Sequence, residues 1–100
     1  MKTSILVRGD LPTGVAIVTA AHASLAAYLG FRDHPDVATW LAGPFRKVVC
    51  RVDEGEFERA KTVDDHVVLT ESSLDDREVA IAFRPREQWP KAFRFLRLSR

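Results

Sequence analysis

Two carboxylates and one imidazole are the side chains best suited to acid–base chemistry. Asp10 follows an apolar segment near the N-terminus, Glu71 follows a later apolar segment, and His22 lies among alanines. Such groups serve as general acids and bases because proteins tune their pKa values toward the working pH. We therefore treat Asp10, His22 and Glu71 as candidate catalytic residues, with Glu71 facing Asp10 across a crevice. The structural alternatives are a turn residue for Asp10 and a hydrogen-bonded, half-buried histidine for His22.

A second set of residues has the chemistry of ligand binding: Arg8, Thr13, Gly14, Ser72 and Ser73. Thr13 and Gly14 lie where a helix is expected to begin, and free N–H groups at a helix start attract anions or carbonyl oxygens. The two serines lack the strand–turn–helix context of a nucleophile elbow, which favours a solvated loop. The sequence contains no Gly-x-Gly-x-x-Gly and no Walker lysine, which argues against a nucleotide-phosphate loop.

The numbers of cysteines and histidines argue against a disulfide-stabilised domain and against a structural zinc domain. Cys50 is the only cysteine, so no disulfide framework can form within the chain. One cysteine and three scattered histidines do not provide a spaced zinc ligand set, and we predict neither a metal nor another cofactor. Cys50 lies in an apolar segment without a basic neighbour that must lower its pKa, which is typical of an inert core thiol.

Length and composition are those of one soluble globular domain spanning residues 1–100. Hydrophobic residues make up 46% and charged residues 29% of the chain. The charge is uneven, with a net +3 over residues 1–52, −7 over 53–78 and +5 over 79–100. A basic end can contact nucleic acid, but attraction to the acidic middle segment and solvated charged faces explain the same pattern.

The segment from Leu11 to Phe31 contains no Asp, Glu, Lys or Arg and is long enough to span a bilayer. Its many alanines, with Pro12, His22 and other polar residues, are instead typical of a core helix in an α/β protein. The N-terminal apolar run reaches Arg8 too soon for a signal peptide. We therefore expect a buried helix, no membrane span and a cytoplasmic protein.

Periodicity and turn residues predict eight elements in the order β-α-α-β-α-β-β-α. The strands are predicted at residues 5–7, 47–52, 66–70 and 78–83, and the helices at 11–31, after Asp33, at 54–62 and at 86–95. A strand, a turn and a long helix open a βαβ unit, so the first two strands should be parallel and adjacent. The last two strands form a hairpin. The prediction is a three-layer α/β/α fold with a mixed four-stranded sheet.

Two segments resemble type-2 peptidyl-tRNA hydrolases. The first is Arg8-Gly9-Asp10-Leu11, a Gly-containing turn and an Ala-rich helix with His22-Ala23, and the second is the stretch from Val79 to Pro85. The resemblance implies a sheet order of 2-1-4-3 with strand four antiparallel. It also implies a homodimer, for which the uncovered apolar candidates are Trp40, Leu41 and Phe45.

The chain departs from the family pattern where the family places its catalytic groups. The turn is about two residues shorter, and Val15 or Ala16 stands where the family has a lysine. Thr19 replaces the family's glutamine, and Glu71 falls at the position of its aspartate. Loss of the lysine removes a stabiliser of a developing oxyanion and a contact to transfer-RNA phosphate.

Three functions follow, in order of preference. The first is a peptidyl-tRNA hydrolase-like domain that binds a small ligand, or supports a different hydrolysis, in a crevice lined by Asp10, Thr13, Gly14, His22, Glu71 and Ser72. The second is a non-catalytic binding or dimerisation module. The third is hydrolysis of peptidyl-tRNA itself, which is disfavoured because it needs Arg8, Arg84 or Arg97 to replace the missing lysine.

Overall fold

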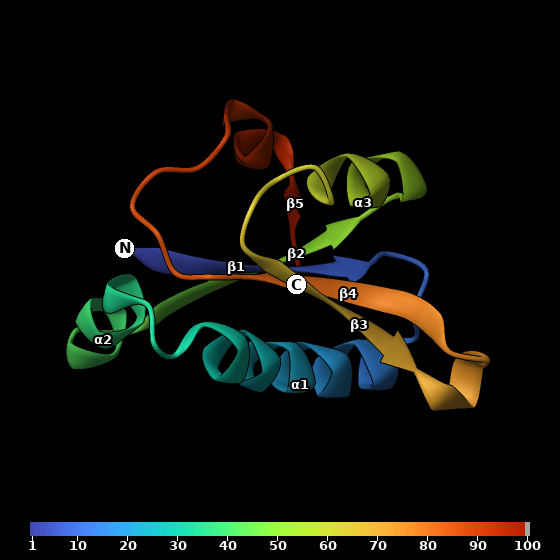
Figure 1. Ribbon diagram of the computed structural model, residues 1–100. Coiled ribbons are helices and arrows are strands. Elements are labelled where there is room, and N and C mark those ends of the chain that lie inside the picture. Colours follow the sequence, from blue (N-terminus) through green and yellow to red (C-terminus); the bar gives the residue numbers. More distant parts are fainter. Residues whose placement is uncertain (100) are drawn as a thin grey trace.

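In the computed structural model, which describes residues 1–99, one five-stranded sheet is flanked by three α-helices (Figure 1). In chain order the elements are β1 (Lys2–Arg8), α1 (Thr13–Phe31), α2 (Pro35–Ala42), β2 (Arg46–Val52), α3 (Glu54–Ala60), β3 (His66–Glu71), the 3-10 helix η1 (Ser72–Leu74), β4 (Arg77–Phe83), the 3-10 helix η2 (Lys91–Phe95) and β5 (Arg97–Leu98).

The sheet is mixed, and its strands are ordered β3-β4-β1-β2-β5. β1 and β2 are parallel, whereas β4 is antiparallel to both β1 and β3. The four predicted strands therefore lie in the predicted order. The prediction of a four-stranded sheet was wrong, because β5 adds an antiparallel edge strand beside β2. With only two residues, β5 is too short to leave a periodic pattern in the sequence.

Helices cover both faces of the sheet. Figure 1 shows α1 and α2 on one face, and α3 with the red C-terminal segment on the other. The side chains of β1 alternate between the two cores: Ile5 and Val7 pack in the core on the α1 side, and Leu6 packs with Phe57 of α3. A central strand covered on both sides explains the unbroken apolar run of β1.

Three predicted helix ends differ from the structure. α1 begins at Thr13, not at the predicted Leu11, and it has no side-chain cap. His34, not Asp33, caps α2, and its Nδ1 accepts the Asp36 N–H at 3.0 Å. The helix predicted from Arg86 is reduced to η2, because proline at position 90 cannot continue a helix interior.

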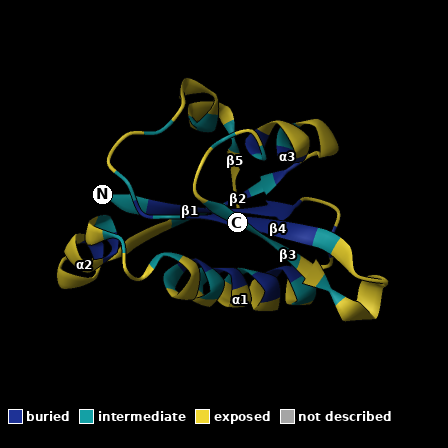
Figure 2. Ribbon diagram, viewed as in Figure 1, coloured by how far each residue is buried: buried dark blue, intermediate teal, exposed yellow. Residues whose placement is uncertain are grey.

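The expectation that α1 is deeply buried was also wrong. Only Ala16, Thr19, Ala23 and Ala27 are buried, all of them small residues on the side that faces the sheet. Among the described residues, α1 is the one helix long and apolar enough to cross a membrane, although 22% of that stretch is buried within the fold. Figure 2 shows its outward side as exposed.

The chain after β4 forms a C-terminal arm, which we define as residues 84–99. Trp89 and Phe93 pack on Phe83 at the end of β4, with ring centroids 5.8 and 5.3 Å from that of Phe83. Further along, the Ser99 N–H donates to the carbonyl of Val49 in β2 at 2.8 Å. These contacts hold β5 at the sheet edge and so determine where Arg97 lies.

Candidate functional site

A pocket of about 520 Å³ opens at the carboxyl ends of β1 and β2. In open α/β sheets this is the edge at which ligands bind. Its lining contains four arginines, Arg8, Arg51, Arg77 and Arg97, and four acidic residues, Asp10, Asp53, Glu54 and Glu56. At the base of the pocket the two strands approach closely, because the Gly9 N–H donates to the Val52 carbonyl at 2.8 Å. A side chain at Gly9 would place a Cβ 3.3 Å from that carbonyl oxygen.

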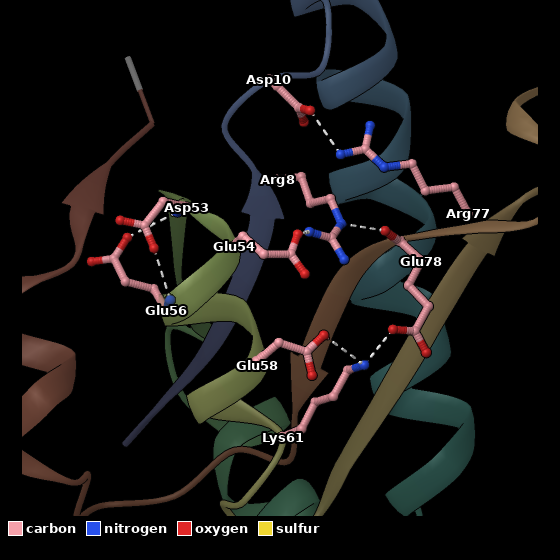
Figure 3. A network of polar contacts seen from close by, with 9 residues as sticks. All are labelled: Arg8, Asp10, Asp53, Glu54, Glu56, Glu58, Lys61, Arg77 and Glu78. Carbon is pink, nitrogen blue, oxygen red and sulfur yellow. Dashed lines mark hydrogen bonds and ion pairs between the residues drawn. The ribbon is translucent and has the colours of Figure 1, made fainter.

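Arg8 is a buried structural cation. Its guanidinium lies 4.0 Å from the ring centroid of Phe57, forms an ion pair with Glu54, and donates from Nε to the Glu78 carbonyl at 2.5 Å (Figure 3). The carboxylate of Glu78 in turn pairs with Lys61, which also contacts Glu58. Arg8 therefore connects β1, α3 and β4 through its Nε and Nη1 donors.

Asp10 is held by Arg77. The Arg77 Nη2 donates to Asp10 Oδ2 at 2.7 Å, and this hydrogen bond lowers the pKa of Asp10 from its ordinary value (Figure 3). A lowered pKa makes a carboxylate a weaker base. Asp10 is thus suited to positioning Arg77 rather than to accepting a proton from a substrate.

The start of α3 contributes two more carboxylates, and both already accept hydrogen bonds from backbone N–H groups. Asp53 accepts the Glu56 N–H at 2.8 Å, and Glu56 accepts the Asp53 N–H at 2.9 Å. This reciprocal pair is a capping box that satisfies two free donors at the helix start. Neither carboxylate forms an ion pair within residues 1–99.

Arg51 and Arg97 are the cations of the pocket that lack a carboxylate partner among the described residues. They are directly opposite each other in the β2–β5 ladder. The Arg51 Nη2 donates to the Leu11 carbonyl at 2.5 Å, whereas its buried Nε has no partner within residues 1–99. Like charges at opposed positions of a sheet repel each other. An anion bound between the two guanidinium groups would relieve that repulsion and use their free donors.

The other residues predicted for the site lie apart from this pocket. His22, Thr19 and Glu71 line a smaller pocket of about 240 Å³ between α1 and the end of β3. The Glu71 carboxylate accepts the N–H of Ser73 at 3.1 Å and its hydroxyl at 3.0 Å, and these hydrogen bonds lower the pKa of Glu71. Glu71 therefore caps η1, and the structure does not bring it into one pocket with Asp10.

The remaining candidates are also separated from one another. Thr13 lines a groove beside α1, Gly14 is open to solvent, and Ser72 is exposed in η1. Arg84 lies at the opposite end of β4, where it pairs with Asp36 at 2.5 Å and Asp65 at 2.8 Å. The structure thus divides the predicted set: Arg8 and Asp10 share the pocket at the ends of β1 and β2, whereas His22 and Glu71 share the smaller pocket beside α1.

Sequence reasoning missed Arg51 and Arg77, and it named Arg97 only as one possible replacement for the missing lysine. A usable signal existed for Arg51, because two adjacent parallel strands end at the same edge of a sheet, and Arg51 precedes the last residue of the second. No comparable signal existed for Arg77, which lies on the antiparallel β4. Arg97 reaches the pocket only through the unpredicted β5.

Comparison with known proteins gave no match: no protein-family model matches this sequence, and no curated protein does.

Proposed function

We propose that this chain is a peptidyl-tRNA hydrolase II-like domain that binds a small anionic ligand, one bearing phosphate or carboxylate groups, in the pocket at the ends of β1 and β2. The observation that carries the proposal is the opposed pair Arg51 and Arg97, which the chain itself leaves without a carboxylate. The strand order β2-β1-β4-β3 supports the fold assignment, because it is the order that the sequence resemblance implies.

Pocket size and polarity restrict the ligand. A volume of about 520 Å³ lies within the range of small-molecule sites. Charged side chains from four strands and α3 line the pocket, which disfavours an apolar ligand because these groups would lose water without gaining partners. Guanidinium groups bind phosphate and carboxylate through paired hydrogen bonds, so both anion types fit.

Binding fits the site better than hydrolysis does. Asp10 is paired with Arg77, and Asp53 and Glu56 are engaged in the capping box. Neither His22 nor Glu71 lines this pocket. A hydrolase of this kind needs a base within hydrogen-bond reach of its nucleophile, and the carboxylates around the pocket are already committed to other partners.

Calorimetric titration with AMP and with citrate tests the proposal and distinguishes the two anion types. We expect Arg51→Gln and Arg97→Gln each to weaken binding about 10- to 100-fold, because a hydrogen bond to a charged group contributes roughly 1.5–3 kcal/mol. Arg46→Gln, at the other end of β2, is the matched control and should bind like the wild type. Equal affinity in all four proteins, or no binding of either anion, would overturn the proposal.

Hydrolysis of peptidyl-tRNA is the second candidate, and the unpaired Arg51 and Arg97 favour it because the substrate carries phosphates. Without the turn lysine we expect hydrolysis at least about 100-fold slower than in a full family member, since loss of one oxyanion donor costs on the order of 10²–10³ in rate. Turnover at family level that Arg51→Gln abolishes, in a variant that stays folded, would make this the function.

A further inference from the structure

The two edges of the sheet differ in how they are protected. Edge strands present unpaired backbone N–H and C=O groups, and proteins usually protect them with short strands, charged side chains, prolines or covering segments. β5, at one edge, has only two residues, and one of them is Arg97. β3, at the other edge, has six residues, and residues 66–70 include no Asp, Glu, Lys, Arg or Pro. The edge of β3 is therefore the one open to pairing.

The outer side of the β3 backbone has no partner strand in the described chain. Its inner side pairs with β4, from His66 opposite Phe83 to Glu71 opposite Arg77. Within residues 1–99, the backbone groups of residues 66–70 form no backbone–backbone hydrogen bond with any segment other than β4. An extended peptide is the ligand whose donors and acceptors match such an edge.

An apolar stripe of α1 lies beside this edge. α1 borders β3, because His22 lines a small pocket with Leu69, and a Cβ at Gly30 would lie 3.2 Å from the Val67 side chain (Figure 1). A strand added to β3 would direct every second side chain toward α1, because side chains alternate between the faces of a sheet. Three large apolar residues at helical spacing from His22, each more than half exposed, form what we call the α1 stripe: Val18, Leu25 and Leu29.

The carboxyl end of β3 is acidic. Glu71 and the exposed Asp75 and Asp76 follow one another closely in the chain, and none of them forms an ion pair within residues 1–99. Arg77, the next cation along the chain, is paired with Asp10. The edge therefore offers apolar contacts along its length and uncompensated negative charge at one end.

We infer that the outer edge of β3 binds an extended segment of another protein, one in which alternating apolar residues follow a pair of basic residues. The segment adds to the sheet antiparallel to β3, which is the more stable pairing, so its basic residues lie beside the acidic end. Its main chain bonds to the free backbone groups, and every second side chain packs on the α1 stripe. This inference is independent of the anion pocket.

A second copy of the chain fits this edge less well than a basic segment does. The arginines that follow β4, near the other end of β3, are already bonded within their own chain: Arg84 pairs with Asp36 and Asp65, and Arg86 donates to the Asp64 carbonyl. Antiparallel self-pairing would also bring the acidic end of one copy toward the exposed Asp64 of the other. Like charges brought together across a sheet destabilise the pairing.

Fluorescence anisotropy with a labelled synthetic peptide tests the inference. The probe has two lysines followed by alternating valine and threonine, and we expect saturable binding at micromolar protein concentration. A peptide with glutamates in place of the lysines should bind at least about 10-fold more weakly, because like charges then face each other. A peptide with proline at its central valine should not bind, because proline cannot donate to a strand ladder. Equal affinity of the proline peptide, or no binding of the lysine peptide, would overturn the inference.

Substitutions in the protein test the two contact regions separately. Leu25→Lys should weaken binding about 10-fold, because it removes an apolar contact and repels the basic peptide. Ile17→Lys is the matched control, since Ile17 is 66% exposed on the side of α1 that faces β2, and it should bind like the wild type. Loss of binding in Ile17→Lys but not in Leu25→Lys would overturn the inference.

The acidic end is tested by the double variant Asp75→Asn and Asp76→Asn. Binding should weaken about 2- to 5-fold, as expected for the loss of exposed ion pairs. Asparagine suits both positions, because Asp75 and Asp76 have left-handed backbones with φ of 55° and 57°. Unchanged affinity together with an unchanged salt dependence would contradict the basic character assigned to the segment.

Hydrogen exchange shows where the peptide lies. Bound peptide should slow exchange of the outward N–H groups of β3 and leave exchange in β5 unchanged. Protection confined to α1 would mean binding to the helix without strand addition. Sedimentation of the protein alone should show no dimer that the peptide dissociates, because such a dimer would assign the edge to a second copy. Either contrary result would overturn the inference.

Discussion

Arg51 and Arg97 lie opposite each other in the ladder between β2 and β5, although 46 positions separate them in the sequence. The chain places two like charges at one cross-strand position and gives neither a carboxylate partner among residues 1–99. The other two arginines of the pocket are paired, Arg8 with Glu54 and Arg77 with Asp10. The arginines of the pocket without an ion-pair partner in the described chain are therefore the two of the β2–β5 pair.

The first prediction is that Arg97→Gln changes stability in opposite directions with and without ligand. Without ligand, removing one of two opposed charges should raise the free energy of unfolding by a few tenths of a kcal/mol, because like charges directly opposite destabilise a sheet. In excess citrate the variant should be less stable than the wild type, because it gains less from binding. Thermal unfolding in both conditions measures this. A variant less stable in both conditions would show that Arg97 has a structural role.

A second prediction concerns pH. Because Arg77 lowers the pKa of Asp10 in the folded state, the contribution of this pair to stability is fully present above the ordinary pKa of 3.8. It is lost as the pH falls below 3.8 through the lowered value. Arg77→Gln should return the pKa of Asp10 toward 3.8, which a carboxyl-carbon NMR titration reports. Asp75, which has no ion pair among the described residues, is the internal control.

Cys50 gives a third prediction. Burial raises the pKa of its thiol, so both access and thiolate formation are suppressed in the folded protein. Reaction with a chromogenic disulfide reagent at pH 8 should be slow in the native state and fast in guanidinium chloride. Equal rates under the two conditions would contradict the placement of Cys50 between β1 and the edge strand β5.

Sequence analysis predicted the strands that have a clear apolar pattern in the sequence. Ile5-Leu6-Val7 is a continuous apolar run because β1 is covered on both faces. The turn residues around this run predicted which strands lie next to β1.

Sequence analysis misjudged the burial of α1 for a related reason. A helix that is apolar all round looks fully buried in sequence, yet α1 has the sheet on one side and no element of the described chain on the other.

A pocket lies beside the predicted residues Arg8 and Asp10, but sequence analysis missed most of its charged lining. Arg8 and Asp10 were identified because they end the first strand. Arg97 depends on a two-residue strand held by aromatic packing far from the pocket, which no local pattern encodes. The pairing of Glu71 with Ser73, two residues away, was a local alternative that sequence analysis did not weigh.

The last prediction links the aromatic cluster to the pocket. Phe93 packs on Phe83 and Trp89, with both ring centroids 5.3 Å away, and this packing precedes β5 in the C-terminal arm. Phe93→Ala should loosen the arm and remove Arg97 from its position opposite Arg51. Phe93 does not line the anion pocket, so any loss of binding must act through the arm.

We expect Phe93→Ala to weaken anion binding to about the level of Arg97→Gln while the rest of the sheet stays folded. Truncation of a fully buried phenylalanine costs about 3–5 kcal/mol, and half-buried Phe93 should cost less. Hydrogen exchange should show faster exchange at the Ser99 N–H, which bonds to Val49, but not in β1 or β4. Phe95→Ala is the matched control, because Phe95 lies in the same 3-10 helix and is 81% exposed. Undiminished affinity in Phe93→Ala with an exposed Ser99 N–H would mean that Arg51 binds the anion without Arg97.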